Sequence, residues 1–388
     1  MVDRKRMLYA LCVFLCLILF ALFSTSQGVL LTPIVEHYGL TESQQGVPNA
    51  ALNIGCAAAL LTSLFVMGRV AKPRLMLIAF AATIVFILPL SLRPSFILLA
   101  RLYLLVGLAV GYIDTLASSA MADLFQGKQA ARMMGALHAM FGIGGMISPV
   151  VMGGLMRGGL RWNQVYLVIA GIGVLFALYV LPVGRGWMRD VTDGRTESLR
   201  LSGGMLKRFF GSREQLLILL SVLAYAYYLG GVTVWTDRYI DVELHNTQLG
   251  AMALSLFWLG MTACRLLAPN LKISPVRYIP VSGLLSAAAL AGGILSGNAY
   301  IMCGAAVVTA LLVGAVIPMI LHVSCERFSE NTMLATTAVL LCVYAGQAAG
   351  PAVIGQMEGA LSIGTGLLTC AAAVGLSGLA ALGVRAKE

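Results

Sequence analysis

Residues 7–35 read MLYALCVFLCLILFALFSTSQGVLLTPIV, an apolar run with one polar interruption near its middle. In an α-helix, about 20 apolar residues cross the roughly 30 Å of hydrocarbon in a lipid bilayer. The run therefore predicts a membrane-spanning helix. It is too long for the apolar core of a signal peptide, and no small-residue cleavage site closes it, so we expect this helix to be retained.

The rest of the chain repeats this pattern. Charged residues make up 11% of the 388 residues, against about 25% in soluble proteins, and 59% are hydrophobic. The continuous runs are unlike the alternating segments of a transmembrane β-barrel. We predict an all-α membrane protein with twelve transmembrane helices, at about 7–35, 45–68, 75–92, 97–125, 131–156, 163–183, 214–238, 246–268, 277–296, 299–323, 333–357 and 362–384.

The distribution of basic residues predicts the orientation of these helices. Basic residues concentrate in cytoplasmic loops, and with the N-terminus inside, 21 of the 26 Lys and Arg residues fall on the cytoplasmic side. Both termini are therefore predicted to be cytoplasmic. The net charge of +10 follows from this topology, so we expect no nucleic-acid partner.

The sequence lacks the motifs of soluble catalytic and metal-binding sites. None of the eight cysteines forms a C-x-x-C pair, and no His or Cys residues have metal-ligand spacing. No H-E-x-x-H, G-x-S-x-G, Walker-type or G-x-G-x-x-G pattern occurs. We therefore expect free thiols, no metal, no cofactor, and neither an enzyme nor an ATP-driven pump.

A polar interval divides the helices into two sets of six. We predict an N-terminal six-helix bundle at 1–184, a cytoplasmic linker at 185–213 and a C-terminal six-helix bundle at 214–388. A weak internal repeat supports the division, because Pro149 is followed by Gly153 in the fifth helix and Pro351 by Gly355 in the eleventh. In transporters built from such pseudo-symmetric repeats, the substrate binds near the midplane between the halves.

One acid lies well inside the predicted spans. Among the sixteen acidic residues, Asp114 is about three residues from the middle of the fourth helix, whereas the others lie nearer the ends. An ionised group in the bilayer core costs from about 2.5 to more than 10 kcal/mol, so such residues are candidates for function. We predict that Asp114 binds and releases the coupling proton of a carrier. The alternative is a structural Asp bonded to a neighbouring helix.

Other polar and aromatic residues at a similar depth are candidates for a substrate cavity. A midplane Trp with amide side chains suits a polyhydroxy ligand, because the indole covers an apolar sugar face and amides exchange hydrogen bonds with hydroxyls. For each residue, helix packing is the alternative. The candidates are Thr25, Gln27, Asn53, Tyr225, Tyr227, Tyr228, Trp258, Tyr344 and Gln347.

Three residues nearer the span ends receive other interpretations. His138 is a possible proton relay, with a helix-to-helix hydrogen bond as the alternative. Arg265 is a possible part of a cytoplasmic gate or a snorkelling side chain. Trp235 is interpreted as an anchor at the membrane interface.

Several strings resemble the major facilitator superfamily, and within it the branch of the L-fucose/proton symporter. AVGYIDTLASS is similar to the branch pattern G-x-x-E-T-x-x-N, with Asp114 at the acid and Ser118 at the Asn. LHAMFGIGGMISP resembles His-x-x-Phe-Gly-x-Gly, and LFWLGMTACRLL resembles F-W-x-G-x-x-x-G-R with Arg265 at its end. The resemblance implies the major facilitator fold, monomers, and a substrate contact at Ser118.

One departure from the branch affects the expected mechanism. The fucose symporter has a second acid on its first helix, and the alignment of YGLTESQQG puts Gly28 at that place. If so, Asp114 has to couple alone.

From these features we expect a secondary transporter for a small polar solute, with a sugar as the leading expectation. It would work with protons by alternating access in the plasma (inner) membrane. A proton-driven efflux antiporter for amphipathic compounds is the alternative, because Ser148-Pro149 and Gly153-Gly154 partly resemble an antiporter motif. A non-transporting receptor or scaffold is a third hypothesis. The expected partners are the solute, protons and the lipid bilayer.

Overall fold

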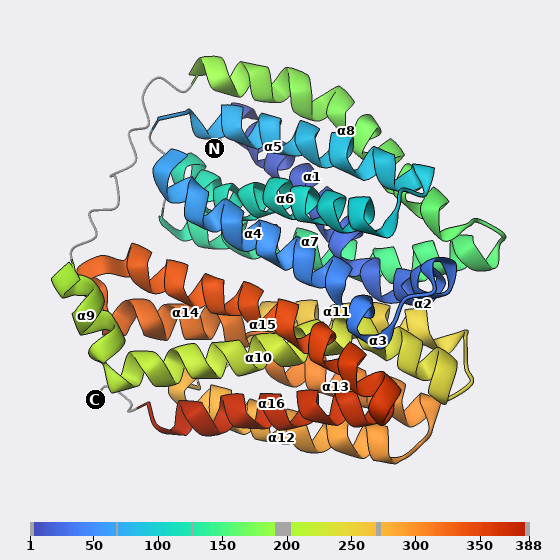
Figure 1. The fold of residues 1–388 in the computed structure, drawn as a ribbon. Coiled ribbons are helices and arrows are strands. Elements are labelled where there is room, and N and C mark those ends of the chain that lie inside the picture. Colours follow the sequence, from blue (N-terminus) through green and yellow to red (C-terminus); the bar gives the residue numbers. More distant parts are fainter. Residues whose placement is uncertain (1–3, 67–68, 126, 191–202, 269–272, 385–388) are drawn as a thin grey trace. The chain divides into compact units, whose positions relative to one another are not determined.

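The computed structural model describes residues 4–66, 69–125, 127–190, 203–268 and 273–384 (Figure 1). Helices joined by short connections make up this part of the chain, which contains no β-strand. Twelve of its helical segments are long and apolar enough to cross a membrane. The predictions of an all-α protein and of twelve spans are confirmed.

Contacts between Cα atoms divide the chain into two compact units. The first comprises Met1–Ser26 and Ala51–Ser198, and the second comprises Gln27–Ala50 and Leu199–Glu388. The predicted bundle boundaries stay a prediction, and residues 191–202 of the predicted linker lie outside the described residues.

The first unit is built from six long helices and one short 3₁₀ segment. They are α1 (Arg4–Thr25), α4 (Val47–Val66, from Ala51 onward), α5 (Lys72–Ile87), η1 (Leu88–Leu92), α6 (Phe96–Leu124), α7 (Gly127–Arg157) and α8 (Trp162–Asp190). Within it α1 packs on α6, α7 and α8, and α5 packs on α6 and α8.

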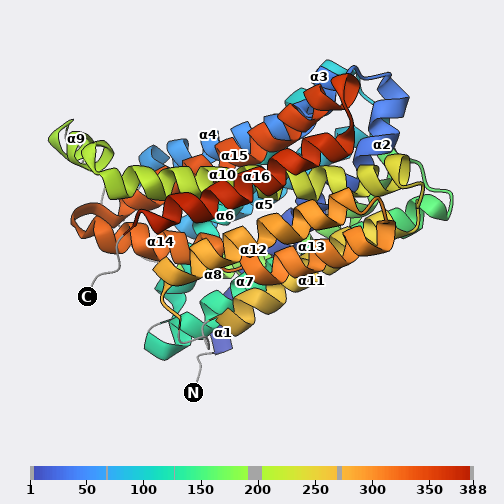
Figure 2. The ribbon, with the colours of Figure 1, turned by 90° about the horizontal axis from the view of Figure 1, so that it is seen from below.

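The second unit contains the remaining helices. They are α2 (Gln27–Tyr38), α3 (Glu42–Gln45), α9 (Gly203–Gly211), α10 (Arg213–Arg238), the π-helical η2 (Tyr239–Glu243), α11 (Leu249–Leu267), α12 (Pro275–Leu295), α13 (Ala299–Val313), α14 (Val316–Arg327), η4 (Ser329–Asn331), α15 (Thr332–Ala360) and α16 (Ile363–Leu382). Two views show α10 beside α15 and α16, and α12 beside α16 (Figures 1 and 2). The short helices α2 and α3 pack on α10 and α15 of this unit.

Two of the predicted spans are interrupted helices. The first breaks at Ser26, between α1 and α2, where the hydroxyls of Thr25 and Ser26 donate to the carbonyls of Ala21 and Phe23. The tenth breaks between α13 and α14 at Gly314. Serine and threonine hydroxyls compete for backbone groups, and such residues favour helix interruptions. The breaks place polar backbone inside apolar spans.

A glycine seam joins α4 to α6 in the first unit. A Cβ atom added to Gly107 would meet the carbonyl oxygen of Leu52, and one added to Gly111 would lie 2.8 Å from Cα of Cys56. A Cβ on Gly55 of α4 would likewise meet the backbone of α6 at Leu104. Small residues let membrane helices approach this closely, because lipid offers no hydrophobic force to drive them together.

A second glycine seam joins α10 to α15. A Cβ on Gly230 would lie 2.6 Å from the carbonyl oxygen of Gln347, and one on Gly346 would lie 2.5 Å from that of Leu223. The same two helices are connected near their far ends by an ion pair of 2.8 Å between Arg238 and Glu358. The pair is largely buried, so its geometry fixes the α10–α15 register more strongly than an exposed pair would.

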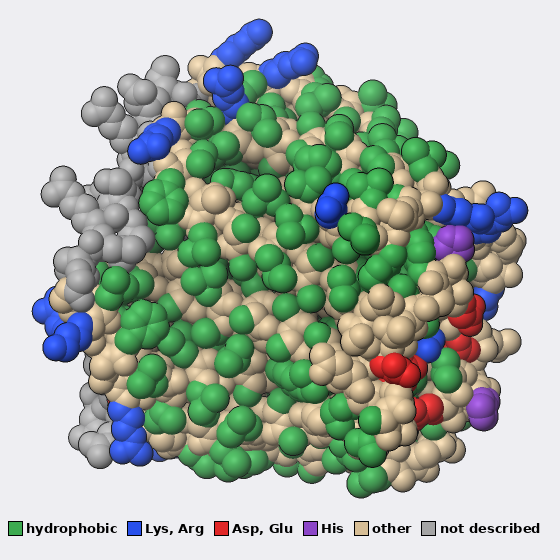
Figure 3. All heavy atoms as spheres, viewed as in Figure 1, with side chains coloured by type: hydrophobic (Ala, Val, Ile, Leu, Met, Phe, Trp, Pro, Cys, Tyr) green, Lys and Arg blue, Asp and Glu red, His purple; other side chains and the backbone are tan. Residues whose placement is uncertain are grey.

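The outer surface is that of a membrane protein. Figure 3 shows hydrophobic side chains spread over the face in view, with charged side chains gathered at the ends of the helices. Large apolar residues are highly exposed along the spans, including Val85 at 58%, Leu178 at 74% and Val281 at 58%. Such a continuous apolar surface suits contact with lipid chains and exceeds what monomeric soluble proteins expose.

The α4–α6 seam predicts the effect of adding a side chain there. We expect Gly107→Leu to lower the free energy of unfolding by about 1–3 kcal/mol, because the new side chain meets backbone that has no room to move aside. Thermal unfolding can be followed with a thiol-reactive dye, since Cys12, Cys16 and Cys56 are buried and become reactive only on unfolding. Gly171→Leu on α8 is the matched control, because no atom lies within 4 Å of its added Cβ. Equal unfolding temperatures for the two variants would contradict the seam.

Candidate functional site

Asp114 lies on α6 of the first unit, four residues past the midpoint of that helix. Its side chain is half-buried, and it is close enough to the fully buried Cys56 thiol of α4 for an electrostatic interaction. It follows Gly111 by three residues, so it lies beside the α4–α6 seam. The rigid seam therefore fixes the position of the acid.

Ser118 follows Asp114 by one helical turn and is also half-buried. Side chains four residues apart lie on the same face of a helix, so Asp114 and Ser118 form one polar strip on α6. Thr115, between them, is bonded to its own helix through the carbonyl of Gly111 at 2.9 Å. Asp114 and Ser118 thus form a polar strip on one face of α6.

The other predicted residues of the first unit have different surroundings. The Thr25 side chain is buried, and its hydroxyl donates to the Ala21 carbonyl at 2.8 Å. Asn53 is buried on α4, one residue from the part of the seam formed by Leu52. His138 on α7 is exposed.

Gln27 and Gly28 begin α2, which packs on α10 and α11 in the second unit. The Gln27 amide nitrogen is buried and has no hydrogen-bond partner among the described residues. A Cβ on Gly28 would lie 2.6 Å from the carbonyl oxygen of Thr233 and 2.5 Å from Cδ1 of Leu254. Position 28 therefore has no room for any side chain in this conformation. The residue there is glycine, and the packing around it would not accommodate an acidic side chain.

Trp258 lies on the same face of α11 as Leu254, one helical turn further along. That face meets α2 at Gly28, so the Trp258 indole and the Gln27–Gly28 segment belong to one region of the second unit. The indole is 7% exposed and packs edge-on against Phe257, with 5.8 Å between ring centroids. An almost enclosed indole offers a flat apolar surface of the kind on which a sugar ring can stack.

Two phenol hydroxyls of α10 are buried without partners. Tyr225 and Tyr228 are both fully buried, their ring centroids are 6.0 Å apart, and neither hydroxyl has a hydrogen-bond partner among the described residues. The Thr309 hydroxyl lies next to Tyr228 and donates to the Ala306 carbonyl, which leaves its oxygen able to accept from a phenol. A buried polar group without a partner costs about 1–3 kcal/mol, so a ligand that bonded to the Tyr225 hydroxyl would remove such a cost.

Tyr344 and Gln347 lie on one face of α15, three residues apart. Tyr344 is buried and Gln347 is half-buried. The backbone of Gln347 touches Gly230 of α10, and its carbonyl accepts from the Asn49 amide at 3.5 Å. Pro351 has no N–H to offer this carbonyl, so Asn49 replaces the missing helical donor.

Arg265 caps the interruption of the tenth span. Its Nε donates to the carbonyl oxygen of Gly314 at 3.0 Å. Pro318 cannot donate to that carbonyl, so the guanidinium supplies the missing hydrogen bond and sets a positive charge at the C-terminal end of α13. Tyr278 donates to the adjacent Leu312 carbonyl at 2.6 Å. A gate role for Arg265 stays a prediction, alongside this structural one.

The structure corrects the interpretation of Trp235. This side chain is fully buried, and its indole N–H donates to the Pro351 carbonyl at 3.1 Å. Trp235 therefore packs α10 on α15 and is no interface anchor.

The structure also separates the polar candidates of α10 and adds one residue on α4. The Tyr227 hydroxyl lies 2.8 Å from that of Thr369 on α16, so this phenol already has a hydrogen-bond partner.

Sequence reasoning missed Asn49, which is buried and donates a hydrogen bond to the backbone of α15. The available signal was its spacing of four residues from Asn53, because that spacing places both amides on one face of α4.

No group of three or more His, Cys, Asp or Glu side chains in the described ranges could hold a metal ion. What the geometry provides instead is a half-buried acid in one unit, and buried amide, phenol and indole groups in the other, within a chain of twelve apolar spans. These features define a membrane transporter.

A model of the Major Facilitator Superfamily matches residues 13–271, and the chain belongs to this family. It is therefore a transporter and not an enzyme, as predicted. Two curated relatives are TsgA protein homologs of Buchnera aphidicola, from Schizaphis graminum and from Acyrthosiphon pisum strain Tuc7. Each is 21% identical over 60% of this chain. The matches span 58% of the length of those relatives.

Solved structures share the fold. A bacterial homolog of the human lysosomal transporter Spinster, inward-facing and occupied, aligns with a TM-score of 0.75 over 98% of this chain and 96% of its own, at 16% identity. A variant of the E. coli fucose:proton symporter FucP aligns with a TM-score of 0.70 over 99% of this chain and 100% of its own, at 13% identity. The predicted major facilitator fold, and the resemblance to the fucose symporter at the level of the fold, are confirmed.

The contact at Gly28 leads to a prediction about a second acid. We expect Gly28→Ala to lower the free energy of unfolding by about 1–3 kcal/mol, because the methyl group meets the Thr233 carbonyl, and Gly28→Asp to lower it further. The loss of fluorescent monomer on heating in detergent measures this. Gly304→Ala on α13 is the control, since nothing lies within 4 Å of its added Cβ. A Gly28→Asp variant as stable as that control would show that the position tolerates an acid.

Proposed function

We propose that the protein is a secondary active transporter that moves a small polar solute together with protons, and that Asp114 is its proton-binding group. Transport is by alternating access, in the plasma (inner) membrane, with both termini cytoplasmic and the protein acting as a monomer. The observation that carries the proposal is the position of Asp114, half-buried near the middle of a membrane-spanning helix.

The physical argument rests on the cost of charge in a low-dielectric environment. A carboxylate inside the hydrocarbon region is disfavoured, whereas a carboxylic acid is neutral and costs far less. Asp114 therefore takes up a proton when it faces the side of higher proton concentration, and it releases the proton when water reaches it from the other side. The seam with α4 holds the acid in place while access changes.

Coupling through one acid is favoured over coupling through two. Gly28, which the resemblance to the fucose symporter branch aligns with a second acid, has no side chain and no space for one. Asp114 is then the group whose protonation has to be linked to solute binding. Such a carrier moves one proton for each solute.

A sugar is the proposed class of solute. The supporting groups are the Trp258 indole, the Gln27 amide and the phenols of Tyr225 and Tyr228, whose hydroxyls lack partners among the described residues. A polyhydroxy ligand offers both donors and acceptors to such groups, together with an apolar ring face for the indole. Thr25, Asn53, Ser118, Tyr344 and Gln347 stay candidates for further contacts, and His138 and Arg265 for a relay and a gate.

The test is solute-driven proton entry in proteoliposomes that contain a pH-sensitive dye, with a panel of sugars added outside. We expect one class of sugar to acidify the lumen with the wild-type protein. Asp114→Asn should reduce this signal at least a hundredfold, because an amide carries no proton at neutral pH, while exchange of labelled sugar across the membrane continues.

Asp123→Asn is the matched control for this experiment. Asp123 is an acid on the same helix, but its side chain is 58% exposed and pairs with Lys72 at 2.6 Å. Proton entry should persist in this variant. Undiminished proton entry with folded Asp114→Asn protein would contradict the assignment of Asp114. Silence of the wild-type protein with every sugar would contradict the class of solute.

A further inference from the structure

The short helix α9 is joined directly to a membrane-spanning helix of the second unit. One residue, Ser212, separates α9 from the span that starts at Arg213, and its hydroxyl caps α10 by accepting from the Gln215 amide at 3.4 Å. Figure 1 shows that α9 does not continue the line of α10 but turns away from it. Because the connection is so short, α9 lies at the depth of the lipid headgroups.

One face of α9 is docked on the second unit itself. Phe209 is fully buried, and its ring packs edge-on against Phe328 with 5.0 Å between ring centroids. The same cluster includes the start of α15 at Leu334. The Asn331 amide donates to the Met205 sulfur at 3.2 Å. These contacts fix the rotation of α9 about its own axis.

The remaining surface of α9 combines an aromatic ring with positive charge. Phe210 is 49% exposed, and Lys207, three residues earlier on neighbouring positions of the helix, is also exposed. Arg213 is exposed as well, and the adjacent Glu214 lies in an ion pair with an arginine of α14. Residues 198–213 contain four basic residues and no acidic one.

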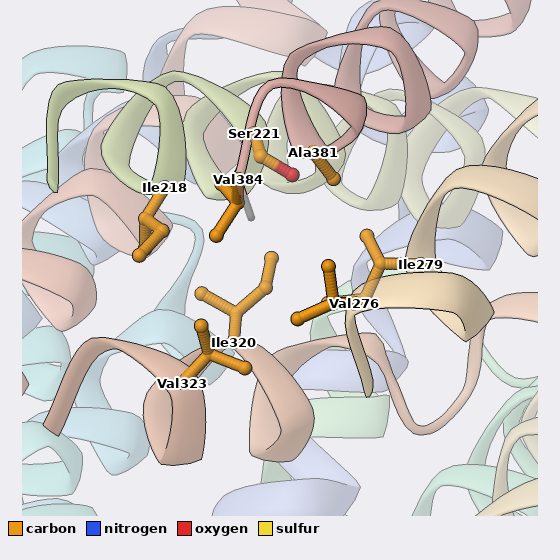
Figure 4. Close-up of a pocket in the computed structure, with 8 residues that line it drawn as sticks. All are labelled: Ile218, Ser221, Val276, Ile279, Ile320, Val323, Ala381 and Val384. Carbon is orange, nitrogen blue, oxygen red and sulfur yellow. The ribbon is translucent and has the colours of Figure 1, made fainter. Parts of the chain in front are cut away.

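The neighbouring surface of α10 faces lipid. Ile218 lies with Ile320 of α14 around a narrow gap between α10, α12, α14 and α16 (Figure 4). Leu216 and Leu220 share the other side of α10 and are 48% and 41% exposed. The apolar outer surface of the span therefore begins six residues after Phe210.

We propose that α9 binds the surface of a membrane that contains anionic phospholipid, with the Phe210 ring among the lipid chains and Lys207 and Arg213 at the phosphates. A helix with an aromatic residue beside basic residues partitions into the interface between headgroups and chains, and anionic lipids strengthen this binding. Because the docked face of α9 holds Phe328, at the turn between α14 and α15, the lipid contact anchors this turn as well. The proposal requires only that the protein is embedded in a membrane.

The test is tryptophan fluorescence of a Phe210→Trp variant in proteoliposomes with brominated lipid chains, because bromine quenches a tryptophan that it touches. Two membranes have the same mixture of phosphatidylglycerol and phosphatidylcholine and differ only in which lipid carries the bromine. We expect brominated phosphatidylglycerol to quench the added tryptophan about twofold more than brominated phosphatidylcholine, because the basic residues enrich anionic lipid around α9. Adding Lys207→Gln and Arg213→Gln should make the two lipids quench equally.

The native tryptophans provide the background for this measurement, since none of the four is more than 7% exposed. Leu175→Trp on α8 is the matched control, because the leucine is 65% exposed along a span and both lipids should quench a tryptophan there alike. An added tryptophan at position 210 that neither lipid quenches, in protein with wild-type thermal stability, would overturn the proposal by showing that α9 faces water or another protein. Equal quenching by the two lipids before the basic residues are replaced would overturn the preference for anionic lipid.

Discussion

The structure depends on one requirement of the hydrocarbon region, which is that backbone carbonyls must find donors where no water is present. Prolines inside spans remove a donor, and at two of them a side chain from another helix replaces it. Arg265 of α11 donates to the Gly314 carbonyl opposite Pro318, and Asn49 donates to the Gln347 carbonyl opposite Pro351. Each replacement joins two segments that are distant in the sequence. The same hydrogen bond therefore satisfies the carbonyl left free by proline and forms a tertiary contact.

The glycine seams bring helix backbones into direct contact. Where Gly107 and Gly111 face α4, and where Gly230 faces α15, the backbones approach until no side chain fits. Asp114 is placed by one seam, and Gly28, wedged against α10 and α11, is excluded from carrying an acid by a similar contact. This packing supports the proposed mechanism with a single acid.

The sequence predicts the fold class, the twelve spans and the family, because continuous apolar runs and basic loops are local signals. It does not predict where the first and tenth spans break. The break at Ser26 is accompanied by local bonds of the Thr25 and Ser26 hydroxyls, whereas at Gly314 the carbonyl is satisfied by the remote Arg265. The same reason explains the error at Trp235. Its place near the end of a span suggested the interface, but the Pro351 carbonyl on α15 receives its N–H in the interior. The candidate site also divides into features that the sequence predicts and features that it does not. An acid in the middle of a span is visible in the sequence. Whether the Tyr225 and Tyr228 hydroxyls find hydrogen-bond partners depends on every neighbouring helix.

The number of protons that accompany each solute tests the central claim most directly. It can be measured in proteoliposomes as the membrane potential at which net flux of a neutral solute reverses under a fixed solute gradient. Coupling through Asp114 alone predicts one proton per solute at every pH where transport occurs. A ratio of two, or a reversal that does not depend on the proton gradient, would contradict the account.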